Sequence, residues 1–246
     1  MDHKVTEHFI TLSLNPDSGR YLVLGNYLTY GIIGAVLMDL SLEGKITIDN
    51  QIIKAERDSK PTGISAYDRM LRTISDSSRE RSVKVWVRRL GQKSPWYRKE
   101  MQKYLAEKGI LKVEKKRFIG IPYRLHYPAR PGARKSLVNR YKDVILYNKP
   151  GEDHETMMLG LMLACRMHRV ITKGGPERRK LRKKLVEITR NNVSETEISN
   201  TIIEIREAIT SAVATTAAIA SSTAATGSGA GGYMVGFHLL RIFKWI

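Results

Sequence analysis

The sequence predicts a mainly α-helical protein: a helical bundle around a central apolar helix, with one protruding β-hairpin. Two long apolar segments carry most of this prediction. In Tyr21–Leu42, apolar residues recur at the spacing of one helix face, and Glu155–Ile171 is apolar on all sides, as expected of a buried central helix. The third observation is a pair of short segments, 45–54 and 112–124, in which apolar residues alternate with polar or basic ones, as is typical of hairpins.

Glycine and proline breaks divide the rest of the chain into shorter elements. Thr6 and Ser65 are in position to cap the helices that follow them. Gly31 and Gly34 let a second helix approach the first long helix closely, because they lack side chains. The segment 79–91 is expected to be a helix, although its β-branched residues also suit a strand. In chain order, the expected elements are a short helix within 5–15, a helix over 21–42, a hairpin over 45–54, helices over 67–75, 79–91 and 95–109, a hairpin over 112–124, and helices over 136–146, 155–171, 177–190 and 197–209.

A change of composition predicts two parts. Residues 1–209 form the helical domain, and residues 210–246 form a tail rich in small residues with an apolar, basic C-terminal segment. The stretch 210–232 consists mostly of Ala, Ser, Thr and Gly, so we expect it to be mobile or loosely helical. The last fourteen residues, YMVGFHLLRIFKWI, suit either a membrane interface or a contact with the body or with another subunit.

The overall charge is strongly positive. The chain of 246 residues has a net charge of +18 and a pI near 10.0. This charge is not typical of metabolic enzymes and predicts nucleic acid, an acidic protein or an anionic membrane surface as partner. The single cysteine, Cys165, excludes an internal disulfide. The sequence contains no signal peptide pattern and no run of about twenty strongly apolar residues, so we expect a cytoplasmic protein.

No motif of catalytic or metal-ligating residues is recognisable. His154 lacks the second histidine of an HExxH motif, and the chain has no P-loop. Cys165 and His168 lie on one face of an apolar helix, where a structural role is favoured over catalysis. Asp39 and Glu43 form a carboxylate pair at helical spacing, which we expect at the surface. The sequence therefore predicts no enzyme activity, no cofactor and no metal site.

The densest positive charge lies between Trp96 and Tyr123, where a helix, a stop at Gly109 and a basic hairpin follow one another. Two interpretations are open. A helix followed by a basic hairpin over 112–124 resembles the end of a winged-helix domain, in which Lys and Arg contact phosphates of nucleic acid. Clustered Lys and Arg also bind anionic lipid head groups, and Arg holds a phosphomonoester through two hydrogen bonds. Composition alone does not decide between them.

Five motifs, spread over roughly Val5 to Ile188, resemble the Golgi phosphoprotein 3 family of peripheral membrane proteins in order and spacing. They are Leu12-Ser-Leu14 with Gly19, Gly31–Leu42 with Glu43-Gly44-Lys45-Ile46, Pro61-Thr62-Gly63, Leu105–Leu111, and Met158–Ala164. The resemblance implies a helical domain that binds phosphatidylinositol 4-phosphate at a basic pocket, and a hairpin that mediates self-association. Eukaryotic members also hold Golgi enzymes by their cytoplasmic tails. The expected self-association residues are Lys112, Val113, Lys115, Lys116, Arg117, Phe118 and Ile119.

The sequence departs from the family at the implied lipid pocket. The family's tryptophan and its first arginine correspond to Leu24 and Ile33, and of two later arginines one corresponds to Pro95 and the other to Arg98. We therefore expect a peripheral protein that binds acidic phospholipid with less selectivity, with nucleic acid or membrane-protein tails as alternative partners. The expected phosphate-binding residues are Arg98, Lys99, Trp96, Arg88 and Arg89.

Overall fold

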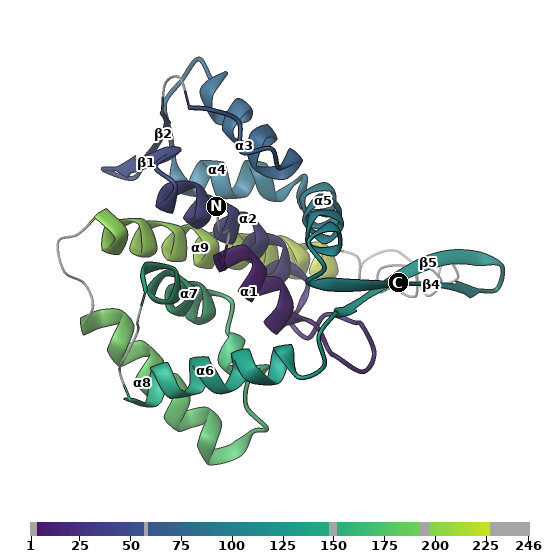
Figure 1. The fold of residues 1–246 in the computed structure, drawn as a ribbon. Coiled ribbons are helices and arrows are strands. Elements are labelled where there is room, and N and C mark those ends of the chain that lie inside the picture. The colour runs from purple at the N-terminus through teal and green to yellow at the C-terminus, as the bar shows by residue number, and fades with distance from the viewer. Residues whose placement is uncertain (1–3, 57–58, 148–151, 192–196, 227–246) are drawn as a thin grey trace.

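The computed structural model describes residues 4–56, 59–147, 152–191 and 197–226. It confirms a mainly helical fold with a protruding hairpin. Figure 1 shows α6 and α8 below, α3, α4 and a small sheet above, and α1, α2, α7 and α9 between them. The elements are α1 (Lys4–Ser13), α2 (Gly25–Leu42), β1 (Ile46–Asp49), β2 (Ile52–Ala55), α3 (Ser65–Ser75), β3 (Arg81–Ser82), α4 (Val83–Gly91), α5 (Ser94–Glu107), β4 (Leu111–Phe118), β5 (Ile121–Pro128), α6 (Ala133–Tyr147), α7 (Asp153–Ala164), η1 (Met167–Arg169), α8 (Gly175–Asn191) and α9 (Glu197–Thr226).

Helix α2 lies at the centre of the bundle and packs against α1, α4, α5, α7 and α9. The close approach predicted at its glycines is confirmed. A methyl group added at Gly31 would lie 2.3 Å from the Phe9 ring, and one added at Gly34 would lie 2.6 Å from Ile209. Side chains of α1 and α9 fill the space beside these two glycines, so the packed interior leaves no room for a further carbon atom.

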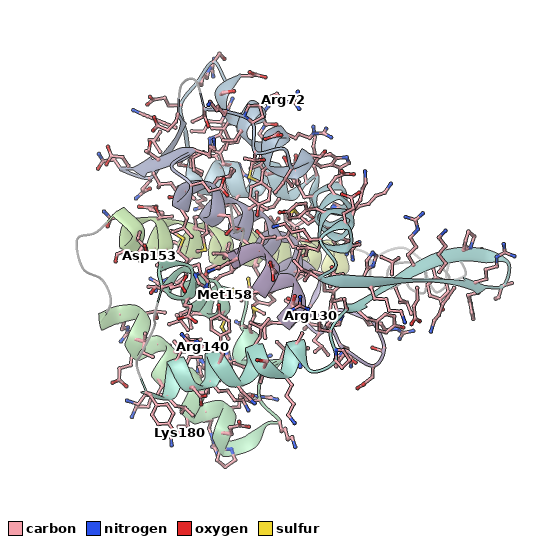
Figure 2. The ribbon with its side chains drawn as sticks, viewed as in Figure 1. Arg72, Arg130, Arg140, Asp153, Met158 and Lys180 are labelled. Carbon is pink, nitrogen blue, oxygen red and sulfur yellow. The ribbon has the colours of Figure 1, made fainter. Side chains whose placement is uncertain are left out.

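Helix α7 is shorter than predicted. The apolar segment 155–171 is not one helix, since α7 ends at Ala164 and Arg166 adopts a left-handed conformation with a φ of 54°. The chain then turns through η1, and Met167 and Ile171 return to the core. The apolar pattern indicates which residues are buried, not whether they belong to one helix. The residues on both sides of the turn are buried, so the pattern did not reveal the turn. Figure 2 shows Met158 of α7 in the interior of the bundle.

Helices α6 and α7 are joined by a pair of charged groups. Arg140 donates hydrogen bonds to both carboxylate oxygens of Glu155, over 2.7 and 2.8 Å. Glu155 is buried, and Arg140 is labelled in Figure 2 on α6. This two-pronged geometry holds one helix against the other more firmly than a single contact would.

The small sheet confirms the predicted first hairpin. Strands β1 and β2 pair antiparallel across a two-residue turn, in which Asn50 and Gln51 have φ angles of 47° and 67°. Such turns match the natural twist of paired strands. The segment 79–91 contains both predicted alternatives: β3 pairs with β2, and α4 follows at once, with the Ser82 hydroxyl accepting a hydrogen bond from the Val85 N–H.

The predicted carboxylate pair is not at the surface. Asp39 of α2 is 1% exposed, and its two oxygens accept hydrogen bonds from the N–H groups of Val5 and Thr6 at 3.0 and 2.9 Å. The hydroxyl of Tyr67 donates to the same carboxylate over 2.7 Å. Asp39 thus caps α1 from another helix, and Thr6 is not the cap. Burial raises the pKa of Asp39, while these hydrogen bonds act in the opposite direction.

Ser65 is also not a cap, because it lies inside α3 and the capping position is Ile64. The loop before α3 is instead fixed by Asp68, whose carboxylate accepts hydrogen bonds from both the N–H and the hydroxyl of Thr62. The Thr62 hydroxyl in turn accepts from the Ile64 N–H. A short-range network therefore sets the direction in which α3 begins.

Helix α9 continues beyond the change of composition at residue 210. Ala212 and Val213 are buried, and the Tyr30 and Thr216 hydroxyls lie 3.1 Å apart. Small side chains let α9 pack closely against α2 and α4, and alanine favours the helical conformation. The division into 1–209 and 210–246 stays a prediction, and the C-terminal segment 233–246 lies outside the described residues. Among the described helices, none is both long and apolar enough to cross a bilayer.

Candidate anion-binding surface

Arg98 is exposed on α5, and its guanidinium lies 6.0 Å from the centre of the Tyr21 ring. The Tyr21 hydroxyl accepts a hydrogen bond from Gln102 over 2.9 Å. Burial raises the pKa of Tyr21 to about 12, so its hydroxyl is neutral at physiological pH. Arg98 forms no ion pair with a carboxylate of the described residues, and its charge is therefore available to an external anion.

The loop between α1 and α2 meets the hairpin beside Arg98. Gly19 packs against the Tyr127 ring of β5. His126, also on β5, has a lowered pKa because of partial burial and the nearby positive charges of Arg124 and Arg98. The imidazole is therefore uncharged at neutral pH. The cationic side chains, not this histidine, provide the charge at the junction of loop and hairpin.

The positions at which the family's pocket residues were expected differ sharply in exposure. Leu24 precedes α2 and is 63% exposed, three residues after Tyr21. Ile33 is completely buried, so no ligand can reach it without repacking the core. Pro95 occupies the first turn of α5, where the missing N–H of proline has no cost. Exposed apolar side chains combined with cationic ones are typical of surfaces that rest in a membrane interface.

The other predicted phosphate-binding residues lie on two helices. Lys99 is exposed beside Arg98 on α5, while Arg88 and Arg89 are exposed on α4. Two of the predicted residues already make a cation–π contact within the protein. The Arg89 guanidinium lies 5.5 Å from the centre of the Trp86 ring, and the guanidinium of Arg69 lies 4.2 Å from the centre of the Trp96 ring. Arg89 and Arg98 thus rest on different rings, and one face of Trp96 is covered.

The second hairpin is a long antiparallel ribbon that projects from the bundle (Figure 1). Its cations are only partly neutralised: Lys112 and Lys116 lie 3.3 and 3.6 Å from the two oxygens of Glu114. Lys115 and Arg117 form no ion pair with a described carboxylate. The ribbon therefore presents positive charge along most of its length.

The tip of the hairpin is apolar and exposed. Phe118, Ile119 and Ile121 are 51%, 84% and 50% exposed, and Val113 on β4 is 38% exposed. Ile119 and Gly120 form the turn, with φ angles of 48° and 78°. A β-branched residue is rare in this left-handed region, which makes isoleucine a costly choice for a free turn.

Sequence reasoning missed a cluster of arginines around His168. This histidine is 5% exposed, and its pKa is lowered to about 4 by burial first and then by the charges of Arg169, Arg182, Arg178 and Arg166. The described residues contain no carboxylate paired with any of the four arginines. The spacing of Arg178 and Arg182 on one face of α8 was the available signal, but the turn at Arg166 was not predictable from it.

The chain is similar both to a protein family and to an individual protein. Residues 6–212 match the family described as Golgi phosphoprotein 3 (GPP34). The chain is also similar to vacuolar protein sorting-associated protein 74 of Schizosaccharomyces pombe, with 26% identity over 159 residues that cover 56% of this chain and 47% of that protein. The match spans about half the length of that relative. The family match begins in α1 and ends in α9, so it includes both hairpins and the surface around Arg98.

Proposed function

This chain belongs to the Golgi phosphoprotein 3 family, and from that premise we propose that it is a peripheral membrane protein that binds anionic phospholipid through the surface around Arg98. The family is known for binding phosphatidylinositol 4-phosphate at Golgi membranes. Its members are generally non-catalytic adaptors, and we expect no catalytic activity here. We further propose that two chains associate through the β4–β5 hairpin.

The observation that carries the lipid proposal is the free guanidinium of Arg98. It is exposed, it has no carboxylate partner among the described residues, and it lies over Tyr21 in the loop that leads to exposed Leu24. A surface that combines a free cation with an exposed apolar side chain gains both electrostatic attraction and burial at an anionic membrane. Lys99 and the unpaired hairpin cations add to the attraction.

The expected selectivity is low. The buried side chain of Ile33 cannot contact a head group, and Leu24 offers no hydrogen bond. Vesicles that contain phosphatidylinositol 4-phosphate and vesicles that contain phosphatidylserine, matched for surface charge, should therefore recover similar amounts of protein. Strong enrichment on the phosphoinositide vesicles would mean that other side chains have rebuilt a selective pocket.

Flotation on vesicles tests the function directly. The protein should float with phosphatidylserine-containing vesicles and not with pure phosphatidylcholine, and high salt should reduce the recovery. Because one basic side chain near a membrane contributes about 1 kcal/mol, Arg98→Gln should lower the partition coefficient about fivefold. Arg72→Gln, on α3 far from the hairpin (Figure 2), is the matched control and should have no effect.

Equal recovery with neutral and anionic vesicles at low salt would overturn the lipid proposal. Two alternatives then become the leading candidates, because each also uses the positive charge. Retention of DNA or RNA in a gel-shift experiment would favour a nucleic-acid-binding protein. Capture by immobilised cytoplasmic tails of membrane proteins would favour an adaptor that acts through those tails.

A further inference from the structure

A cleft of about 540 Å³ lies where α1, the end of α5 and the start of α6 meet. Its volume is in the range of small-molecule sites. Figure 2 shows Arg130, one of its lining residues, where the hairpin strands join α6. The cleft lies among residues other than those proposed to contact lipid, so it calls for a separate explanation.

One wall of the cleft contains a buried hydroxyl without a partner. Thr11 of α1 is 3% exposed, and its Oγ1 has no hydrogen-bond partner among the described residues. Buried hydroxyls on helices usually donate to the carbonyl four residues earlier, as Ser13 and Thr189 do in this protein. An unpaired buried hydroxyl is costly, so such a group in a native structure calls for an explanation, and a bound ligand is one.

Other residues that line the cleft are suited to an anion. Arg130 is exposed and forms no ion pair with a described carboxylate, and Lys108 adds a second cationic side chain. The N-terminus of α6, at Gly132 and Ala133, also lines the cleft, and the first turn of α6 has no acidic residue. Helix N-termini attract anions, because their first N–H groups lack partners within the helix.

The remaining lining limits the kind of ligand. Ile110 and Leu137 supply an apolar wall, and Glu7 adds one carboxylate. His8 contributes no charge at neutral pH, since its pKa is lowered to about 4, mainly by burial and then by His154. A compact anion with an apolar body fits this lining better than a large polyanion.

We propose that this cleft binds a small molecule or head group that carries one phosphate or carboxylate on an apolar body. Arg130 and the start of α6 hold the anionic group, the Thr11 hydroxyl donates to it, and the apolar body lies against Ile110 and Leu137. This site goes beyond the proposed lipid surface and does not use Arg98.

Methyl NMR of the full chain tests the proposal with phenyl phosphate as the probe. Titration should shift the methyl signals of Ile110 and Leu137, and phenol or inorganic phosphate should bind more weakly because each lacks half of the recognised chemistry. Arg130→Gln should weaken the binding of phenyl phosphate about tenfold, as expected from loss of a charged hydrogen-bond donor. Arg72→Gln should leave the affinity unchanged.

Thr11→Val separates a ligand-binding role from a structural one. Because the Thr11 hydroxyl makes no hydrogen bond in the described protein, this variant should keep or raise the melting temperature while weakening the binding of phenyl phosphate. The matched variant Thr6→Val should lower the melting temperature, since the Thr6 hydroxyl lies within hydrogen-bond distance of the Tyr67 hydroxyl, at 2.9 Å. A Thr11→Val protein that is less stable but binds as well as wild type would contradict the proposal.

A second arm identifies the source of the anionic group. Vesicles with phosphatidic acid that shift the same two methyl signals would support the cleft as a site for lipid head groups, and shifts with phenyl phosphate alone would support a soluble ligand. No shift with either probe, or equal weakening by Arg72→Gln, would overturn the proposal. Loss of flotation in Arg98→Gln with intact methyl shifts would separate this site from the lipid surface.

Discussion

The bundle interior and the β4–β5 hairpin place polar and apolar groups in opposite ways. At the centre of the bundle a carboxylate, that of Asp39, is buried and takes hydrogen bonds from two backbone N–H groups and a tyrosine. At the end of the hairpin, Phe118, Ile119 and Ile121 are exposed to solvent. The buried Asp39 carboxylate thus has hydrogen-bond partners within the bundle, whereas the hairpin carries apolar surface that only a second surface can cover.

This difference separates stability from association. Changes that remove a hydrogen-bonded group from the bundle interior should lower the free energy of unfolding, because the buried partners are left without a hydrogen bond. Changes at the hairpin tip should alter the proposed association between chains and leave the free energy of unfolding almost unchanged. The following predictions test this separation, beginning with the largest expected effect.

Asp39→Ala should lower the free energy of unfolding by about 3 kcal/mol or more, because it leaves two N–H groups of α1 and the Tyr67 hydroxyl buried without an acceptor. Urea denaturation followed by circular dichroism measures this loss. Asp17→Ala, which removes an exposed carboxylate from the loop before α2, is the control and should change stability by less than about 0.5 kcal/mol. Similar losses in both variants would mean that the buried network is not a source of stability.

Acid should destabilise the bundle through His168. Its pKa is about 4 in the folded protein and near 6.5 when unfolded, so the unfolded state binds the proton first as the pH falls. Stability is therefore lost as the pH falls from about 6.5 to about 4, by about 1–2 kcal/mol for this residue. Denaturation at several pH values should give a flatter profile for His168→Gln than for wild type.

The same experiment compares the bundle with the hairpin. The pKa of His126 on β5 is also lowered, but this ring is only partly buried. His126→Gln should therefore flatten the pH profile less than His168→Gln does. A larger effect for the hairpin histidine would show that the ribbon is more tightly integrated into the fold than its exposure indicates.

Ile119→Asn should weaken self-association without destabilising the chain. Asparagine tolerates the left-handed conformation at this position, so the variant should be as stable as wild type or more stable by up to about 1 kcal/mol. Removal of the most exposed apolar side chain of the tip should shift the oligomer towards monomer in sedimentation velocity. Leu24→Asn, which removes a comparably exposed side chain outside the hairpin, should leave the oligomer intact.

Local patterns explain what could be predicted from the sequence. The hairpins and most helices could be predicted from apolar spacing and turn residues. The close packing at Gly31 and Gly34 could be predicted because glycine has no side chain. The cap of α1 could not be predicted, because its acceptor, Asp39, is 34 residues from Val5. The turn at Arg166 could not be predicted either, because the residues on both sides of it are apolar and buried.

For the candidate site, single residues could be predicted from the sequence, but the residues that contact them in the fold could not. Arg98 was predicted from the family resemblance, yet its contact with Tyr21 depends on how a distant loop folds back. The cleft beside α6 forms where three segments distant in the sequence meet. No residue spacing in the sequence indicates that these segments lie together. Its most informative residue, Thr11, is an ordinary threonine in a short helix, and only its missing partner distinguishes it.

The single cysteine gives the molecule a useful spectroscopic property. Cys165 is 3% exposed behind Gly31, and burial raises the pKa of its thiol, so the reactive thiolate is scarce and out of reach. A cysteine introduced at the hairpin by Phe118→Cys would thus be the one thiol that accepts a spin label. The separation between two such labels would then report, in ångströms, whether paired chains meet tip to tip or side by side.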